Sequence, residues 1–261
     1  MSEPGRLATM VARLVWATRI VDKLYGRFNQ LRTRVVMRRA PAGFFDAYND
    51  VAFSRQAAYR PDSTVFRDDL FLWEQQAIDD WFPAPPATIL IGGVGGGREA
   101  LALARRGYAV TAFEPARDLV VGLTRRLQRT GAAIGVYEGR YETLPMVVEP
   151  NGARVDLSAR APFDAAIFGW ASYSHLRTDA LRIDALRAMA RLARGPILLS
   201  YFPFADARRA ESAEGSFGLF TGYFRDLTED DVRAQAEAAG VDVLWLLHDT
   251  GWPRAILRAR P

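Results

Sequence analysis

The sequence contains no cysteine, one lysine and two histidines, and these absences exclude several kinds of chemistry. Without cysteine the chain forms no disulfide and offers no thiolate nucleophile. The lysine, Lys23, does not follow a glycine-rich turn, which argues against a P-loop nucleotidase. His175 and His248 are too few for a histidine-rich zinc or iron site. We therefore expect neither a covalent nucleophile nor a tightly bound metal.

Long apolar runs are also lacking. No uninterrupted apolar segment is long enough to cross a bilayer. The N-terminus shows neither the apolar core nor the small-residue cleavage site of a signal peptide. Together with the missing cysteines, these features lead us to expect a cytoplasmic protein.

Basic charge is concentrated at the N-terminus. Residues 1–40 carry a net charge of +7 in a chain whose total is +4, so the remainder is slightly acidic. Over residues 5–38 an apolar residue recurs every three or four positions, which predicts one long helix with a heptad-like stripe. We favour packing of this stripe on the protein's own body. Oligomerisation through the same helix and peripheral contact of residues 5–38 with an anionic membrane are the alternatives.

Two further helices are expected before the main domain, over residues 44–60 and 67–82. The stretch Pro83-Ala84-Pro85-Pro86 then ends the leader, because proline breaks regular structure. We therefore divide the chain into a helical N-terminal extension, residues 1–86, which we call the leader, and a domain over residues 87–261.

Short apolar runs alternate with amphipathic stretches from residue 87 onward. This alternation predicts an α/β fold, with helices on both faces of a mostly parallel, doubly wound sheet. Asp249-Thr250-Gly251 supplies a turn, so the last two strands should form an antiparallel hairpin. The expected strands cover residues 88–91, 109–113, 133–137, 165–168, 196–201, 241–247 and 254–258, and the expected helices cover 98–106, 117–129, 178–193 and 228–239.

A glycine-rich turn, Gly92-Gly93-Val94-Gly95-Gly96-Gly97, joins the first strand of this domain to its first helix. Missing side chains let a ligand approach the backbone, and a helix start offers free N–H groups to it. Glu114 ends the second strand, where a carboxylate can bind two ribose hydroxyls. Turn, helix and acid in this order predict a nucleoside site.

The form of the turn decides which nucleoside is expected. A dinucleotide site has Gly-x-Gly-x-x-Gly, but Arg98 occupies the last position of that pattern. Gly93-x-Gly95-x-Gly97 instead resembles motif I of class I S-adenosylmethionine-dependent methyltransferases. The resemblance covers residues 87–259 and implies a Rossmann-like, seven-stranded sheet with an antiparallel last strand.

The resemblance also implies roles for individual residues. The cofactor would be S-adenosylmethionine, with S-adenosylhomocysteine as the product and no metal. Glu114 would hold the ribose, the segment after the third strand would flank the adenine, and the segment after the fourth would face the sulfonium. The residues expected to bind the cofactor are Gly92, Gly93, Val94, Gly95, Gly97, Glu114, Pro115, Arg140, Tyr141, Glu142, Trp170 and Ser172.

Two positions depart from the family pattern. Ile91 stands where many members carry an acid before the first motif glycine, and Arg140 stands where an aspartate often contacts the adenine amine. Glu142 or a backbone group would have to replace that aspartate. These departures keep open a non-catalytic partner protein that retains the fold.

Methyl transfer requires alignment of donor and acceptor, and a hydroxyl acceptor gains from a general base. His175 is the candidate base, although it could equally cap or pack beneath a helix, and Tyr173 is a candidate for orienting the acceptor. Aromatic residues of the leader and of the 203–224 loop predict a pocket for a small apolar or aromatic molecule. The chosen acceptor-binding candidates are Tyr48, Tyr59, Trp73, Phe204, Phe220 and Tyr223.

The favoured prediction is methyl transfer to a small molecule, with oxygen or carboxyl preferred over nitrogen as the acceptor. A nucleic-acid methyltransferase that uses the basic N-terminal helix is ranked lower, because no Asp-Pro-Pro-Tyr motif follows the fourth strand. Basic charge alone is a generic feature. A nicotinamide dehydrogenase is disfavoured by Arg98 and by the terminal hairpin.

Overall fold

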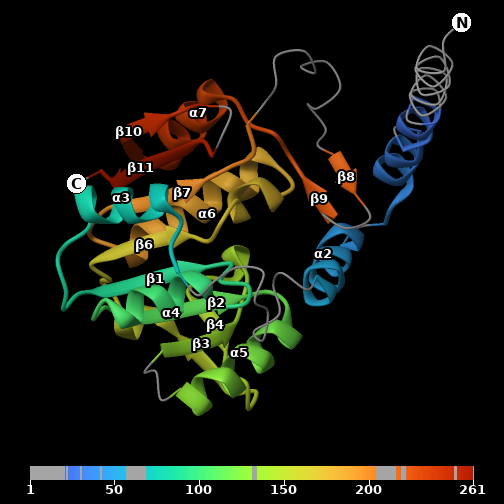
Figure 1. Cartoon of the computed structure of the whole chain (residues 1–261). Coiled ribbons are helices and arrows are strands. Elements are labelled where there is room, and N and C mark those ends of the chain that lie inside the picture. The colour runs from blue at the N-terminus through green and yellow to red at the C-terminus, as the bar shows by residue number, and fades with distance from the viewer. Residues whose placement is uncertain are drawn as a thin grey trace, which may run out of the picture. The chain divides into compact units, whose positions relative to one another are not determined.

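The computed structural model describes residues 21, 23–29, 31–41, 43–56, 69–130, 134–203, 216–218, 222–249 and 252–260 (Figure 1). The contacts divide the chain into two units, Met1–Phe44 and Phe45–Pro261. In the first unit the described residues from 21 to 39 are helical, as the apolar stripe predicts. Residues 5–20 of the predicted helix lie outside the described residues. Among the described helices, none combines the length and the apolar character needed to cross a membrane.

The second unit is built on a nine-stranded sheet with the order β10-β11-β7-β6-β1-β2-β3-β4-β5. The central strands β7, β6, β1, β2 and β3 are parallel. The bounds of the nine strands are β1 Thr88–Gly92, β2 Ala109–Glu114, β3 Ile134–Glu138, β4 Met146–Val148, β5 Arg154–Asp156, β6 Ala165–Phe168, β7 Ile197–Ser200, β10 Val241–Leu247 and β11 Arg254–Ala259.

All seven expected strands are present, and the predicted α/β fold class is confirmed. Strand β11 lies between β7 and β10 and is antiparallel to both, as the expected terminal hairpin requires. The sheet has nine strands instead of seven because β4 and β5 extend the edge beyond β3. Each of these edge strands has only three residues, too short for an alternating pattern to reveal it.

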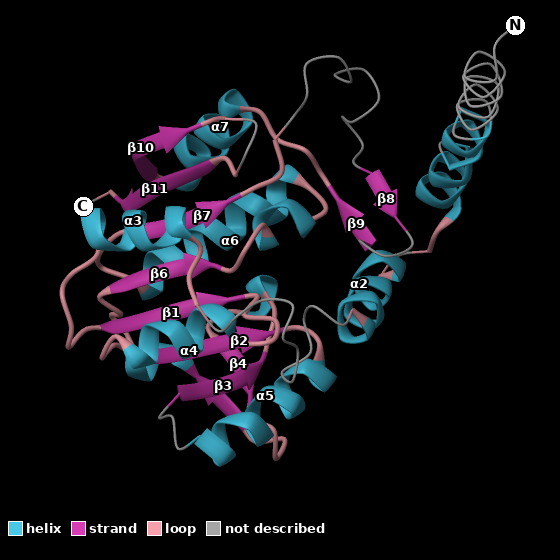
Figure 2. Ribbon diagram, viewed as in Figure 1, coloured by secondary structure: helices cyan, strands magenta, loops and turns pink. Residues whose placement is uncertain are grey.

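Helices cover both faces of the sheet (Figure 2). Successive strand residues point to opposite faces, so Leu90 packs in one core cluster while Ile89 and Ile91 pack in the other. The first cluster contains residues of α6 (Asp179–Leu192) and α7 (Glu229–Ala239). The second contains residues of α3 (Leu72–Trp81), α4 (Arg98–Arg105) and α5 (Arg117–Thr130).

The leader contributes two helices to the second unit, α3 and most of α2 (Phe44–Arg55). Ala77 and Ile78 of α3 are buried in the same core cluster as Ile89 and Ile91. The expected functional boundary at residue 86 stays a prediction. A separate small hairpin, β8 (Ser216–Gly218) and β9 (Gly222–Phe224), lies in the stretch where a loop was expected.

The order of the strands reverses at β1, and this reversal indicates where a ligand can bind. From β1 the chain proceeds outward through β2 and β3, and then returns to place β6 on the other side of β1. Ligands of open α/β sheets bind at such a reversal, outside the carboxyl ends of the strands. The ends of β1, β2 and β6 meet there, since Gly92 pairs with both Phe113 and Phe168.

Candidate functional site

The glycine-rich turn follows β1 at this reversal and leads directly into α4. Gly97 has a φ of 87°, a value that favours glycine, and a Cβ there would lie 2.4 Å from a methyl carbon of Leu123. After β6, a Cβ on Gly169 would lie 2.2 Å from the carbonyl oxygen of Gly93. Packing against Leu123 thus accounts for Gly97 without a ligand, and the close approach of Gly169 is likewise internal packing, so the run of glycines alone does not demonstrate a ligand.

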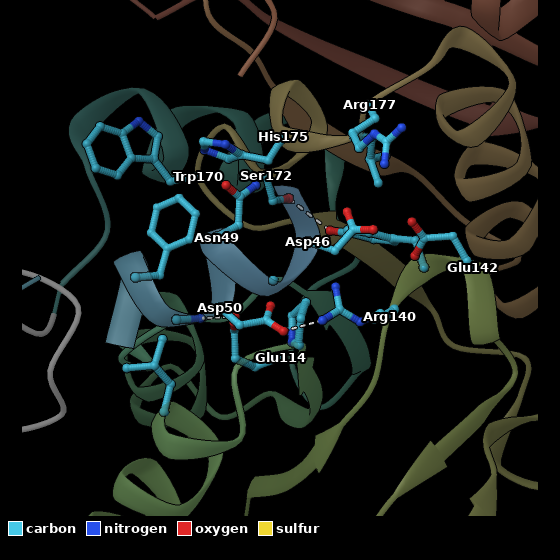
Figure 3. Close-up of a pocket in the computed structure, with 17 residues that line it drawn as sticks. Asp46, Asn49, Asp50, Glu114, Arg140, Glu142, Trp170, Ser172, His175 and Arg177 are labelled. Atoms are coloured by element: carbon cyan, nitrogen blue, oxygen red, sulfur yellow. Dashed lines mark hydrogen bonds and ion pairs between the residues drawn. The ribbon is translucent and has the colours of Figure 1, made fainter. Parts of the chain in front are cut away.

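A cavity opens beside the turn and gathers residues from six separate segments (Figure 3). The segments are α2, the glycine-rich turn, the loops that follow β2, β3 and β6, and the start of α5. The lining residues are Asp46, Asn49, Asp50, Phe53, Gly93, Gly95, Glu114, Pro115, Leu119, Arg140, Tyr141, Glu142, Trp170, Ser172, His175, Leu176 and Arg177.

Glu114 is the buried carboxylate of this cavity. It accepts hydrogen bonds from the backbone N–H of Gly95 at 2.9 Å and of Ala116 at 3.1 Å. Burial raises the pKa of the Glu114 carboxyl to about 7, and the two N–H donors oppose that rise. Glu114 therefore ties the glycine-rich turn to the end of β2 while its carboxylate faces the cavity.

Helix α2 places four cavity residues at positions i, i+3, i+4 and i+7, which share one helix face: Asp46, Asn49, Asp50 and Phe53. Asp50 forms an ion pair with Arg140 from the loop after β3. Asn49 accepts a hydrogen bond from the N–H of Tyr223 at 2.8 Å. These four residues were not predicted from the sequence, although three polar residues at helical spacing, Asp46, Asn49 and Asp50, are the signal that could have revealed them.

His175 lies in the 3₁₀ turn η4 (Ser172–His175) after β6 and faces the cavity. Its Nδ1 lies 2.7 Å from the carbonyl oxygen of Tyr223, so Nδ1 carries the proton and donates it. Burial lowers the pKa of His175 to about 4, and the imidazole is therefore neutral at pH 7. In this tautomer Nε2 has a free lone pair with which to accept a proton.

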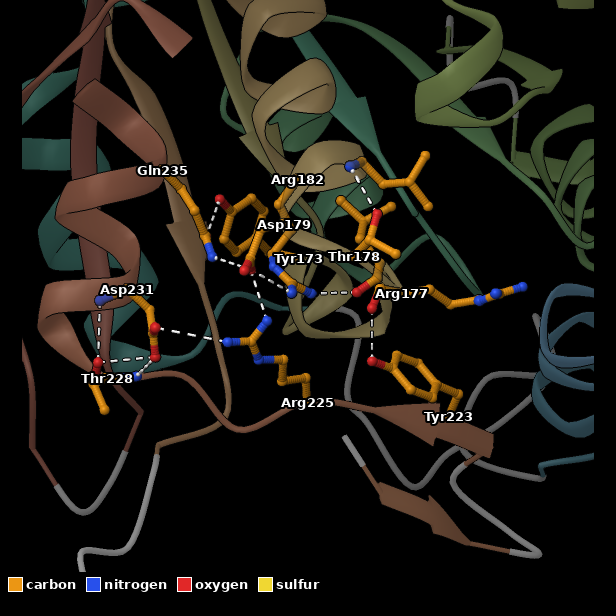
Figure 4. Close-up of polar contacts among 12 residues, drawn as sticks. Tyr173, Arg177, Thr178, Asp179, Arg182, Tyr223, Arg225, Thr228, Asp231 and Gln235 are labelled. Carbon is orange, nitrogen blue, oxygen red and sulfur yellow. Dashed lines mark hydrogen bonds and ion pairs between the residues drawn. The ribbon is translucent and has the colours of Figure 1, made fainter. Parts of the chain in front are cut away.

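A polar network beneath the cavity holds the segment that carries His175 (Figure 4). The guanidinium of Arg182 is buried and donates to the carbonyl of Leu176 and to Asp179. Asp179 also accepts hydrogen bonds from Arg225 and from Gln235. The loop after η4 is thus fixed from below by charged hydrogen bonds.

Tyr173 belongs to this network and does not line the cavity. Its side chain is fully buried, and its hydroxyl donates to Gln235 at 2.7 Å. The predicted role of Tyr173 in orienting an acceptor is therefore corrected to a structural one. His175 lines the cavity whereas Tyr173 is buried against Gln235, so the two candidate residues are not brought together at one site.

The leader is joined to the glycine-rich turn by a buried ion cluster. Arg98 binds both carboxylate oxygens of Glu74, at 2.6 and 2.7 Å, and also contacts Glu99 at 2.8 Å. Glu99 in turn accepts from the backbone N–H of Trp170 at 3.3 Å. One guanidinium therefore connects α3, the start of α4 and the loop after β6, and this explains why arginine follows the last glycine.

Nine of the twelve predicted cofactor-binding residues line the cavity: Gly93, Gly95, Glu114, Pro115, Arg140, Tyr141, Glu142, Trp170 and Ser172. Gly92, Val94 and Gly97 do not line it. Gly92 leaves room for the rings of Phe113 and Tyr141, and Val94 is packed in the core. The hydroxyl of Tyr141 contacts Ser172 Oγ at 2.8 Å and so joins the loops after β3 and β6.

The predicted acceptor-binding residues that the structure describes do not line the cavity. Tyr48 packs against Phe217, and Trp73 packs beside Phe71 next to the sheet, so neither lines the cavity. Tyr223 lies beneath His175 and donates its hydroxyl to the carbonyl of Arg177. Tyr59, Phe204 and Phe220 lie outside the described residues.

No group of three or more histidine or acidic residues within the described part of the chain is arranged to hold a metal ion. The side chains at the cavity are carboxylates, guanidinium groups, hydroxyls, aromatic rings and one imidazole. A buried carboxylate beside exposed turn backbone suits hydroxyl groups of a ligand, and a neutral imidazole suits proton acceptance.

No family model and no curated protein matches the sequence, but many solved structures match the fold. The methyltransferase CcbJ from Streptomyces caelestis has a TM-score of 0.61 and 14% identity, over 82% of this chain and 100% of that chain. The N-terminal domain of EvdMO1 with SAH bound has a TM-score of 0.51 and 21% identity, over 72% and 80%. The glycopeptide N-methyltransferase MtfA, complexed with S-adenosyl-L-methionine, has a TM-score of 0.54 and 14% identity, over 72% and 87%. The fold is therefore that of class I S-adenosylmethionine-dependent methyltransferases.

Proposed function

We propose that this chain is an S-adenosylmethionine-dependent methyltransferase that acts on a small molecule, with oxygen or carboxyl preferred as the acceptor. One observation carries the proposal. Glu114 and the glycine-rich turn face the same cavity, at the carboxyl ends of β2 and β1, in a methyltransferase fold. Similar structures with SAH or S-adenosyl-L-methionine support the cofactor, and one solved in the presence of SAH and D-fucose supports a small-molecule acceptor.

The cavity residues fit the parts of this cofactor. Glu114 would accept hydrogen bonds from two ribose hydroxyls, and Pro115 and Leu119 offer an apolar surface for the adenine. The backbone of Gly93 and the side chain of Trp170 border the remaining space. When bound, S-adenosylmethionine supplies an electrophilic methyl group on its sulfonium.

The protein's own contribution is alignment, exclusion of water and movement of one proton. One face of helix α2 lines the cavity, and this helix would restrict the access of water to a bound ligand. Nε2 of His175 would accept the proton of an acceptor hydroxyl as the new oxygen–carbon bond forms and the carbon–sulfur bond breaks. A carboxylate acceptor has no proton to lose and would need only orientation.

Calorimetric titration tests this proposal directly. We expect S-adenosylmethionine and S-adenosylhomocysteine to bind with a stoichiometry of one, and NADH not to bind. Binding of NADH without binding of either sulfur compound would overturn the proposal.

The proton-accepting role of His175 predicts a distinctive titration. Because burial lowers its pKa to about 4, the NMR signal of His175 should stay constant between pH 8 and pH 5, where an ordinary imidazole titrates. The sequence has only two histidines, so a His248→Ala variant assigns the signals. A midpoint near 6.5 for His175 would contradict the buried, neutral imidazole.

The same role predicts a selective kinetic defect. His175→Ala should lower kcat for a hydroxyl acceptor by about 10²-fold or more, the range expected for loss of a general base. The affinity for S-adenosylhomocysteine should change little. Equal losses of turnover and of cofactor affinity would instead indicate that His175 only supports the loop.

A further inference from the structure

The cavity contains three charged groups to which the proposed placement of the cofactor, along Glu114, Pro115 and Leu119, gives no role, although the sequence had suggested Glu142 for the adenine. Asp46 comes from α2, Glu142 from the turn after β3, and Arg177 from the loop after η4. Figure 3 shows the three side chains on the same side of the cavity, away from Glu114. Within the described residues, none of them forms an ion pair or a side-chain hydrogen bond.

Their neighbours at the cavity are, by contrast, already engaged. Asp50 is paired with Arg140, Asn49 is bound to the backbone of Tyr223, and Ser172 contacts Tyr141. Among the described residues, the contact of the Arg177 guanidinium is with the ring of Phe45, at 5.5 Å from its centroid. Asp46 and Arg177, which are both partly buried, therefore remain as the groups available to a second ligand.

These charges argue against the apolar acceptor that the sequence suggested. An apolar ring in contact with Asp46 and Arg177 would remove water from both groups without replacing its hydrogen bonds, which is unfavourable. An anionic acceptor would meet Asp46 and Glu142, and a cationic one would meet Arg177. A neutral ligand with several hydroxyl groups avoids each of these conflicts.

We propose, on the basis of the proposed methyl transfer, that the acceptor is a neutral polyhydroxylated ring, such as a sugar, held by Asp46 and Arg177. A vicinal diol contains both donors and acceptors, so one hydroxyl can donate to the Asp46 carboxylate while its neighbour accepts from the Arg177 guanidinium. Glu142, at the exposed rim, binds a further hydroxyl. The ring of Phe53 faces the cavity and offers an apolar surface to the C–H face of the sugar.

The arrangement also places a reacting hydroxyl. His175 lies two residues before Arg177, on the same loop, and its Nε2 is the free proton acceptor. A ring anchored through two hydroxyls by Asp46 and Arg177 presents a third to His175. Loss of either anchor should therefore weaken acceptor binding while the cofactor site, centred on Glu114, stays intact.

Saturation-transfer NMR with two probe pools tests this inference. One pool contains D-glucose, D-mannose and D-galactose, and the other contains phenol, catechol and 2-naphthol. We expect the sugar pool to bind the full-length protein, with and without saturating S-adenosylhomocysteine, and Asp46→Ala and Arg177→Ala to weaken that binding by about tenfold or more. The exposed residues Asp80 and Arg191 supply matched controls, Asp80→Ala and Arg191→Ala, which should bind sugars like the wild type.

Calorimetry with S-adenosylhomocysteine separates the two proposals. If the cofactor product binds but the phenol pool is preferred, or if neither pool binds, the sugar inference is wrong and the methyltransferase proposal stands. Sugar binding that does not respond to Asp46→Ala or Arg177→Ala also overturns the inference. Sugar binding that is lost in both variants, with cofactor affinity unchanged, supports the sugar inference.

Failure of the wild type to bind S-adenosylhomocysteine would refute the proposed function. The sugar titrations without cofactor would still decide whether Asp46 and Arg177 bind a sugar.

Discussion

Replacing Glu114 with alanine should weaken the binding of S-adenosylhomocysteine by about a hundredfold or more. The variant would lose two charge-assisted hydrogen bonds to the ribose, each worth about 1.5–3 kcal/mol, and about 1.4 kcal/mol corresponds to a tenfold change in affinity. It would also release the N–H of Gly95, which Glu114 holds in the glycine-rich turn. Calorimetry or equilibrium dialysis measures the dissociation constant.

Glu138 supplies a closely matched control. It lies directly opposite Glu114 in the register of β2 and β3, but it forms an ion pair with Arg117 and does not line the cavity. Glu138→Ala should therefore leave the affinity within about twofold, as expected for an exposed ion pair. Equal effects of the two substitutions on affinity would show that Glu114 does not bind the cofactor.

The pKa of Glu114 adds a pH dependence to the same experiment. Because burial raises this pKa to about 7, the carboxyl is mostly protonated at pH 6 and mostly ionised at pH 8. Affinity for S-adenosylhomocysteine should rise over this interval, and Glu114→Gln should abolish the rise. The free energy of unfolding of the free protein should change with pH in the opposite direction. The raised pKa of Glu114 stabilises the fold fully below pH 4.5, and this contribution is lost as the pH rises through 7.

The sequence was sufficient to predict the central fold because its signals there are local. Seven strands, four helices of the main domain and the terminal hairpin follow from apolar periodicity and turn residues, which are properties of neighbouring positions. The short strands β4 and β5 escaped because three residues carry no period. They change only the edge of the sheet and not the ligand site.

The site was predictable in one half only. The cofactor side follows strand ends, so its residues could be read from the order of strands. The opposite side depends on contacts between distant segments, such as Asp50 with Arg140, which are 90 positions apart. Aromatic residues of the leader were a poor guide to the acceptor site, because apolar side chains pack into cores as readily as into pockets. Trp73, for example, packs against a core cluster.

Arg98 shows how a departure from a motif can be explained by a partner elsewhere. From the sequence it served only to exclude a dinucleotide site. In the structure Arg98 is held by Glu74, Glu99 and the carbonyl of Asp69, and it lies 3.9 Å from the centroid of the Phe71 ring. The stretch Leu72-Trp73-Glu74 ahead of the turn therefore supplies the carboxylate that makes arginine at this position favourable.

Replacing Arg98 with methionine should consequently lower the free energy of unfolding by about 3–5 kcal/mol, because two buried carboxylates lose their shared cation. Arg106→Met is the matched control: Arg106 directly follows the same helix and pairs with Asp79, but the Asp79 side chain is 64% exposed. That variant should lose about 1 kcal/mol or less. Urea unfolding at pH 8 measures both.

The pH dependence separates charge burial from simple loss of packing. Burial raises the pKa of Glu74, and the hydrogen bonds from Arg98 oppose that rise. Without Arg98 the pKa of Glu74 should rise further, so the folded variant takes up a proton more readily than its unfolded chain as the pH falls. The destabilisation of Arg98→Met should therefore shrink steadily from pH 8 to pH 5. A loss that is constant over this range would show that Arg98 acts through the contacts of its side-chain carbons, and not through its charge.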